Sequence, residues 1–80
     1  MLNLEIISPE KRMFTGIIQL VKLPGTLGSF EIMENHAPII STLTKGKIKV
    51  KEVDGTITFF DITGGLIEAS NNQINVLVEK

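Results

Sequence analysis

The sequence predicts an all-β fold, an antiparallel β-sandwich of about eight to ten short strands. First, apolar and polar residues alternate with a period of two, as in residues 2–6 and 74–78, which is the pattern of half-buried strands. Second, Ile, Val, Thr and Phe are abundant, and no segment shows the period of an amphipathic helix. Third, Gly, Pro and Asn recur at short intervals, so each strand between them is brief.

Turn residues set the order of the expected strands along the chain. Pro9 ends the first strand because it has no N–H to donate to a sheet. The segment 23–28 combines Pro24 with two glycines, Gly25 and Gly28, and suits a turn with a positive φ angle. Pro38 disfavours the helical region for Ala37 before it. The later turn signals are Asp54-Gly55, Thr63-Gly64-Gly65 and Asn71-Asn72. Strands are therefore expected near residues 2–7, 16–23, 29–33, 39–44, 47–53, 56–62, 66–70 and 73–79.

The hairpin at Asp54-Gly55 allows two registers. In the strand before it, every second residue is a lysine and these lysines face one side: Lys47, Lys49 and Lys51. With a two-residue loop, Phe60 and Ile62 share that side, whereas with a three-residue loop Ile57 and Phe59 share it. Either the strand is central and packed on both faces, with lysine stems covering its outer apolar groups, or the hairpin is a docking face for another protein.

Composition bounds the possible functions. The chain has 80 residues, with 8 Lys or Arg against 9 Asp or Glu, and a formal net charge of −1. This length fits a single domain, residues 1–80, without a repeat or linker. The near-neutral charge argues against nucleic-acid binding, and the lack of Cys excludes disulfides and thiol chemistry. Because no apolar run approaches the roughly twenty residues of a membrane span, we expect no direct membrane insertion.

No residue pattern indicates a catalytic, cofactor-binding or metal site. His36 is the only histidine, whereas a metal site needs three or four convergent ligands. Ser41 lacks the Gly-x-Ser-x-Gly turn of a nucleophilic serine. The segment Gly25-Thr26-Leu27-Gly28 is not followed by Lys-Ser or Lys-Thr, so it does not match a phosphate-binding loop. We therefore expect no cofactor, and a function that lies in the surfaces of the protein.

Several motifs, taken in order, resemble one known family. They are Leu4-Glu5-Ile6-Ile7-Ser8-Pro9-Glu10, Phe14-Thr15-Gly16, Val21-Lys22-Leu23-Pro24-Gly25, Asn35-His36-Ala37-Pro38-Ile39-Ile40, Gly46-Lys47-Ile48, Gly64-Gly65-Leu66-Ile67-Glu68 and Val76-Leu77. Together they span nearly the whole chain, which resembles the N-terminal domain of the epsilon subunit of F-type ATP synthase. The His-Ala-Pro loop and the Gly-Gly-x-x-Glu turn are the most specific of them.

The resemblance implies a ten-stranded β-sandwich at the foot of the central stalk, held by the gamma subunit and resting on the c-ring of the membrane sector. Such a domain is a non-catalytic rotor subunit that couples ion-driven rotation to ATP synthesis. It would lie at the cytoplasmic face of the bacterial inner membrane, peripheral through the complex. The alternative is a free-standing β-sandwich module that binds a ligand or a protein, although the absence of Trp and Tyr counts against sugar stacking.

By motif, the resemblance implies two interface regions. The c-ring contact is the loop formed by Gly25, Thr26, Leu27, Gly28 and Ser29, and the region near gamma and the ring is formed by His36, Ala37, Pro38 and Ser41. Many relatives carry Pro-Gly where this chain has Glu34-Asn35. In the family a pair of C-terminal helices can follow the last strand and carry ATP sensing and self-inhibition. Because this sequence ends at Lys80, we expect neither activity.

Overall fold

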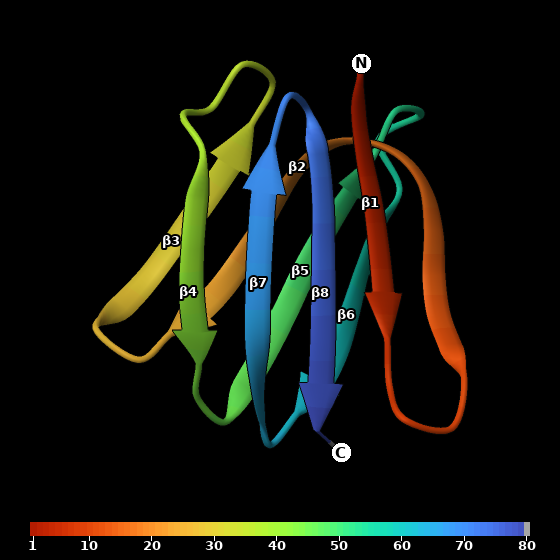
Figure 1. Cartoon of the computed structure of the whole chain (residues 1–80). Coiled ribbons are helices and arrows are strands. Elements are labelled where there is room, and N and C mark those ends of the chain that lie inside the picture. Colours follow the sequence, from red (N-terminus) through yellow and green to blue (C-terminus); the bar gives the residue numbers. More distant parts are fainter. Residues whose placement is uncertain (80) are drawn as a thin grey trace.

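The computed structural model describes residues 1–79 and folds them into eight strands (Figure 1). These are β1 (Leu2–Ile7), β2 (Arg12–Gly25), β3 (Gly28–Met33), β4 (Ile39–Leu43), β5 (Gly46–Glu52), β6 (Ile57–Ile62), β7 (Gly64–Ser70) and β8 (Gln73–Glu79). Among the described residues there is no helix long and apolar enough to cross a membrane. The all-β prediction is confirmed, and each expected strand corresponds to one observed strand.

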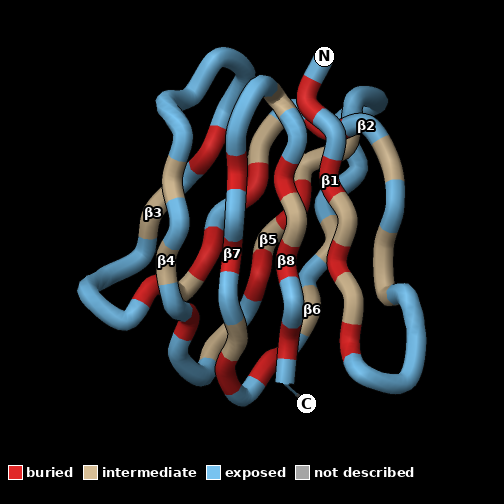
Figure 2. The backbone as a smooth tube through the Cα atoms, viewed as in Figure 1, coloured by how far each residue is buried: buried red, intermediate tan, exposed pale blue. Residues whose placement is uncertain are grey.

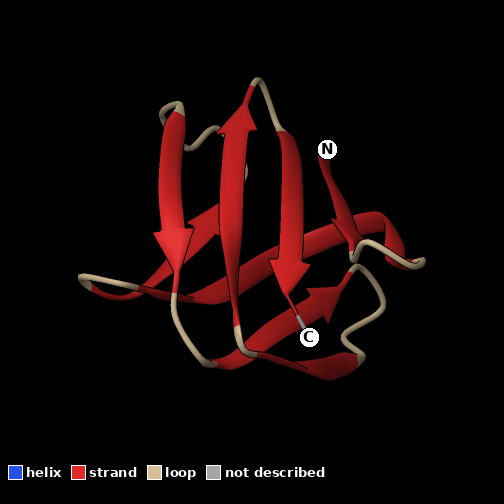
Figure 3. Ribbon diagram, turned by 60° about the horizontal axis from the view of Figure 1, so that its bottom comes forward, coloured by secondary structure: helices blue, strands red, loops and turns tan. Residues whose placement is uncertain are grey.

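The strands form two layers that β2 joins. Residues 12–18 of β2 pair with β1, and the strand then passes into the second layer, where it pairs with β5 and β3. The first layer has the order β4-β7-β8-β1, and the second has the order β3-β2-β5-β6 (Figures 1 and 3). The predicted sandwich is therefore confirmed, with its two sheets continuous through one long strand.

Two details differ from the sequence prediction. β2 begins at Arg12 rather than near residue 16, because Gly16 pairs with Leu4 and continues the strand instead of interrupting it. In addition, β1 and β8 pair in parallel along residues 3–7 and 73–77, so the sheet is mixed rather than wholly antiparallel. Short turns impose antiparallel pairing on consecutive strands, but no turn links the first strand to the last, and their relative direction is not constrained in this way.

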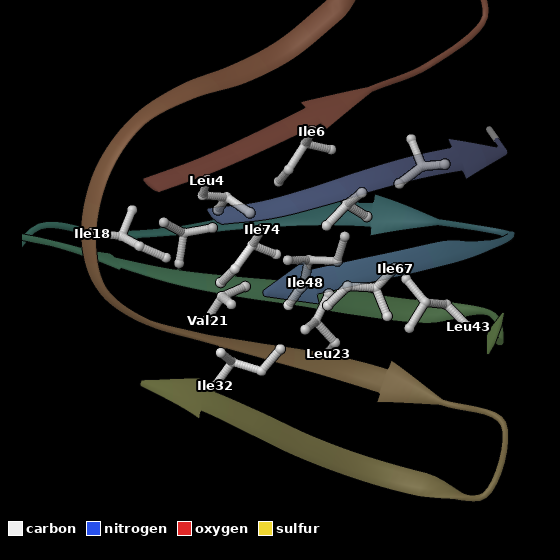
Figure 4. Close-up of a cluster of buried hydrophobic side chains, with 14 of the residues drawn as sticks. Leu4, Ile6, Ile18, Val21, Leu23, Ile32, Leu43, Ile48, Ile67 and Ile74 are labelled. Atoms are coloured by element: carbon white, nitrogen blue, oxygen red, sulfur yellow. The ribbon is translucent and has the colours of Figure 1, made fainter. Parts of the chain in front are cut away.

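The core lies between the two layers. Buried and exposed residues alternate along most strands (Figure 2), which is the periodicity that the sequence predicts. Leu4 and Ile74 from the first layer meet Val21 and Ile48 from the second (Figure 4), and all four are almost completely buried. Burying each such side chain stabilises the fold by about 1.5–3 kcal/mol. The outer faces of both layers are left to carry the function.

The β5–β6 hairpin adopts the three-residue loop of the two registers considered. The Gly55 N–H donates to the Glu52 carbonyl oxygen at 2.9 Å, and the Glu52 N–H donates to the Thr56 carbonyl oxygen at 2.8 Å. Gly55 has a φ of 92°, a conformation that favours glycine and closes the turn with a bulge. The resulting register places Ile57 and Phe59 on the lysine side of the hairpin.

Candidate protein-interaction surfaces

The outer face of the first layer carries a continuous row of apolar side chains. Ile7 of β1, Leu77 of β8 and Leu66 of β7 are direct neighbours across the strands. Ile40 of β4 lies beside this row and is 69% exposed. We call these four residues the apolar face. Surface hollows over β7 and β8 are lined by the same side chains. A contiguous exposed apolar patch of this kind is typical of a protein-interaction site.

Acidic side chains surround the apolar face. Glu5 and Glu68 lie at the edge of one hollow, and Glu79 lies at the edge of the other. Arg12 provides a cation at the same side, with its Nε 3.1 Å from Glu5 Oε2. An apolar centre within a polar rim is the usual anatomy of a protein–protein interface. This face therefore suits a partner with an apolar patch and basic surroundings.

The predicted ring-contact loop, residues 25–29, forms the tip of the β2–β3 hairpin. A side chain at Gly25 would place its Cβ 2.6 Å from the Gly28 carbonyl oxygen, so only glycine fits there without a shift. Thr26 ties the tip to β4, because its N–H donates to the Thr42 carbonyl oxygen at 3.2 Å and the two Oγ1 atoms are 2.9 Å apart. Leu27 is left fully exposed. The tip is thus a fixed protrusion with one apolar side chain at its end.

The loop between β3 and β4 is held by contacts with two other parts of the chain. Asn35 has a φ of 66°, and its N–H donates to Asn72 Oδ1 in the β7–β8 turn at 2.6 Å. Glu34 Oε2 lies 2.7 Å from the α-ammonium group of Met1. These contacts fix the position of the His-Ala-Pro segment that follows.

The four predicted residues in and after this loop differ in exposure. His36, Ala37 and Pro38 are exposed, and His36 bonds within its own loop, with its Nδ1 2.6 Å from the Ala37 carbonyl oxygen. Ser41 is half-buried in β4, and its Oγ donates to the Thr42 carbonyl oxygen at 3.2 Å. The structure therefore brings the first three residues to one surface and leaves Ser41 apart from them.

The two predicted interface regions lie at opposite ends of β3 (Figure 1). Residues 25–29 precede this strand and residues 36–38 follow it. Six residues of strand span about 20 Å. One flat partner surface at one end of the molecule therefore cannot contact both regions.

The outer face of the second layer has more basic than acidic side chains, with Glu31 directly opposite Lys22. We call its lysines the lysine face: Lys22, Lys47, Lys49 and Lys51. Lys49 lies opposite Phe59 and Lys51 lies opposite Ile57, and both apolar side chains are exposed. Lys47 Nζ forms an ion pair with Asp61 Oδ1 at 2.7 Å. β5 lies in the interior of its layer, as the interpretation of a central strand requires. Its outer face nevertheless carries lysines beside exposed apolar side chains, as the docking-face interpretation requires.

The other two residues named for the docking face lie on the core side of β6. Ile62 is buried. Phe60 packs against the core and meets Phe14 edge to face, with 6.1 Å between ring centroids. The four residues therefore do not share one surface, because neighbouring positions of a strand point to opposite faces. Of the four, only Ile57 and Phe59 are exposed on the lysine side of the hairpin.

The sequence contains a signal for the apolar face in its adjacent apolar residues. Each of its residues adjoins an apolar residue of the same strand that is buried or, in the case of Ile39, partly buried: the pairs are Ile6-Ile7, Ile39-Ile40 and Leu66-Ile67, and the run is Val76-Leu77-Val78. Because successive side chains of a strand point to opposite faces, one member of each pair must point outward. Adjacent apolar residues in a half-buried strand thus predict an apolar outer surface.

Comparison of the sequence with known families gives a match over its full length. The family model described as "ATP synthase, Delta/Epsilon chain, beta-sandwich domain" matches residues 1–80. The ATP synthase epsilon chain of Caulobacter vibrioides is 36% identical over 78 residues, covering 98% of this chain and 90% of the relative. The epsilon chain of Chlorobaculum tepidum is also 36% identical over 78 residues, covering 98% and 89%. That of Polaromonas naphthalenivorans is 33% identical over 76 residues, covering 95% and 55%.

Solved structures share the fold. A chain of the Euglena gracilis mitochondrial ATP synthase, in a structure of OSCP, F1 and the c-ring, superposes with a TM-score of 0.93 at 12% identity. A chain in the central stalk and c-ring structure of the Tetrahymena thermophila mitochondrial ATP synthase superposes with a TM-score of 0.80 at 20% identity. The match covers 99% of this chain in both cases, and 51% and 63% of those chains. At these identities the likeness establishes the architecture.

Proposed function

The chain belongs to the family of β-sandwich domains of the ATP synthase delta/epsilon chain, and from this membership we propose that it is a non-catalytic subunit of the central stalk. In this role it joins the gamma subunit to the c-ring and couples ion-driven rotation to ATP synthesis. The observation that carries the proposal is the match to epsilon chains over 98% of this sequence and about nine-tenths of the length of such relatives as that of Caulobacter vibrioides. The complex would hold it at the cytoplasmic face of the bacterial inner membrane.

The fold suits a part that transmits torque. A segment that opens locally under load would dissipate rotation, and local opening is rare where backbone hydrogen bonds and apolar contacts are dense. Here β2 runs through both layers, and β1 is paired on both sides, by β2 and by β8. The two layers therefore cannot slide past each other without breaking pairings of one continuous strand. This supports a stiff strut.

We assign the apolar face to the gamma subunit. A rotor subunit must stay bound to its shaft through many turnovers, which calls for an interface with a desolvated apolar centre. Ile7, Leu66 and Leu77 form such a centre, and Ile40 extends it.

We assign the hairpin tip at residues 25–29 to the polar loops of the c-ring. It protrudes at one end of the molecule and is tied to β4, so it can transmit a lateral force. Residues 36–38 lie at the other end of β3, so they cannot share this contact with the c-ring. We therefore assign them to the gamma subunit.

Reconstitution tests the function directly. The chain is combined with gamma and the remaining subunits of the same organism, and ATP hydrolysis and ATP-driven proton pumping are measured together. We expect the complex that lacks the chain to hydrolyse ATP with little pumping, and addition of the chain to restore pumping. Unchanged coupling in its absence, together with affinity of the isolated chain for a small ligand, would instead favour a free-standing binding module.

The assignment of the tip has its own test. Leu27→Asp changes a side chain without intramolecular packing, so the fold is retained. We expect this variant to bind gamma normally and to lower pumping without lowering hydrolysis. Exchange of Leu27 for Ala is the matched control, because it removes the same contact without adding a charge.

The expected lack of ATP sensing also remains a prediction, which an NMR titration of the chain with ATP and magnesium checks.

A further inference from the structure

β6 is an edge strand whose second side is open. Within residues 1–79 it pairs with β5 alone, and it ends the strand order of its layer (Figure 1). The Glu52 N–H bonds the Thr56 carbonyl oxygen, and hydrogen-bonded pairs alternate along an antiparallel ladder. The N–H and C=O groups of Ile57, Phe59 and Asp61 therefore point away from β5, toward the open side.

This edge has few of the features that normally prevent strand addition. Natural edge strands are protected by proline, lysine, a bulge or very short length. β6 has six residues, no proline and no lysine, and its pairing with β5 runs without a shift of register. Asp61 is its one charged residue, and it forms an ion pair with Lys47. The strand thus offers a regular row of backbone donors and acceptors.

The surface beside this edge is apolar and basic. Ile57 and Phe59 are exposed on the outer face, and behind them on β5 stand Lys51 and Lys49. Neither lysine forms an ion pair with any described residue, in contrast to Lys47. A strand added to β6 would lie two strand spacings from β5, about 10 Å, which is within the combined reach of a lysine and a glutamate side chain.

We propose that the β6 edge binds an extended acidic segment of a partner protein as an added strand. The partner's backbone would bond the outward groups of Ile57, Phe59 and Asp61, which is the mode of β-augmentation. Its carboxylates would lie on the outer face and reach Lys49 and Lys51. This site is on the second layer, opposite the apolar face, and does not depend on the proposed stalk function.

Charge argues against a second copy of this chain as the occupant. Antiparallel pairing of two β6 edges would place the lysines of both copies on the same face of one continuous sheet, with their β5 strands about three strand spacings apart, so the second copy would add positive charge to this face. Asp61, the one acid in the strand, is engaged by Lys47 within each copy. An acidic segment would provide carboxylates for Lys49 and Lys51, whereas a second copy would add more lysines to the same face.

A designed peptide tests the proposal on the full chain. The probe is a capped peptide in which Val and Glu alternate over six residues between Ser-Gly ends, and the readout is amide hydrogen exchange by NMR. We expect exchange at Ile57 and Phe59 to slow by more than about tenfold at saturation, because their amides become hydrogen-bonded. Substitution of Lys for Glu in the peptide should weaken binding by about tenfold or more.

Two results would overturn the proposal. One is binding of the glutamate peptide without slower exchange at the Ile57 and Phe59 amides, because that shows charge attraction without strand addition. The other is slow exchange of the same amides in the chain alone with a dimeric mass in sedimentation, because the edge then belongs to a second copy. Methylation of the peptide amides that face β6 should abolish binding, and full binding by the methylated peptide would also contradict the model of an added strand.

Protein variants provide a second arm. Ile57→Pro removes an outward N–H at the first residue of the strand, where proline is tolerated, and should abolish peptide binding. Ile57→Thr removes a similar side chain but keeps the N–H, so it should retain most of the affinity. Equal loss in both would show that the side chain rather than the backbone binds. If Ile57→Pro does not fold, the methylated peptide still decides the question.

Discussion

Among single residues, Asn35 occupies a backbone conformation that most side chains disfavour. Its φ of 66° lies in the left-handed region, where Asn is tolerated and Ala is strained. We predict that Asn35→Ala lowers the free energy of unfolding by about 1 kcal/mol relative to Asn35→Gly. Both variants lose the same side chain and keep the N–H that donates to Asn72, so their difference isolates the backbone. Urea denaturation measures it, and equal stability of the two would contradict this account.

The Asp54 carboxyl in the β5–β6 turn makes the stability of the chain depend on pH. The Thr56 backbone N–H donates to its Oδ1 at 2.9 Å, and this bond, followed by one from the Thr56 side chain, lowers the pKa of the Asp54 carboxyl below its ordinary value of 3.8. A lowered folded-state pKa contributes stability that is present above the unfolded pKa and is lost as pH falls through the folded pKa. We therefore predict that the stability difference between wild type and Asp54→Asn shrinks as pH falls below about 4. Urea denaturation across this range measures the difference, and a constant difference would show that the ionised carboxyl makes no contribution.

Between elements, the close approach of β7 and β8 depends on Gly65. A Cβ at this position would collide with the Leu77 carbonyl oxygen and lie 3.2 Å from the Val78 Cα, and backbone atoms cannot move aside as a side chain can. We predict that Gly65→Ala destabilises the chain by about 2–3 kcal/mol. Gly16→Ala is the matched control, because its Cβ would meet only the Phe14 ring at 3.4 Å. Thermal and urea denaturation should therefore place the Gly16 variant close to wild type, and similar losses in both would remove the special role of Gly65.

The strands and the sites were not equally predictable from the sequence. Alternation and turn residues predict the strands because both signals are local, and the three-residue loop at Gly55 was one of two registers that the sequence allowed. The parallel pairing of β1 with β8 joins residues about seventy positions apart, and no local signal determines it. The separation of residues 25–29 from residues 36–38 likewise follows from β3 standing between them. To predict the apolar face, one must know which member of each adjacent apolar pair points outward. Only the pairing of the strands decides this.

The whole molecule presents two unlike outer surfaces. The first layer is apolar within an acidic rim, whereas the second carries the lysine face beside Ile57 and Phe59. A partner that fits one surface is mismatched in charge with the other, so the two surfaces should select different partners. Under the proposed assignment, the apolar face would bind gamma while the lysine face stays available to another partner.

Two aspartate variants test this division. Leu77 on the apolar face and Phe59 on the lysine face are 55% and 57% exposed, so replacing either with Asp should disturb folding to a similar, small extent. A charge within a desolvated interface centre is costly, and we predict that Leu77→Asp weakens gamma binding by more than about tenfold while Phe59→Asp leaves it within about twofold. Titration calorimetry with purified gamma measures the affinities, and melting temperatures verify the folds. If Phe59→Asp is the variant that loses gamma, the shaft binds the second layer, and the apolar face must serve another partner.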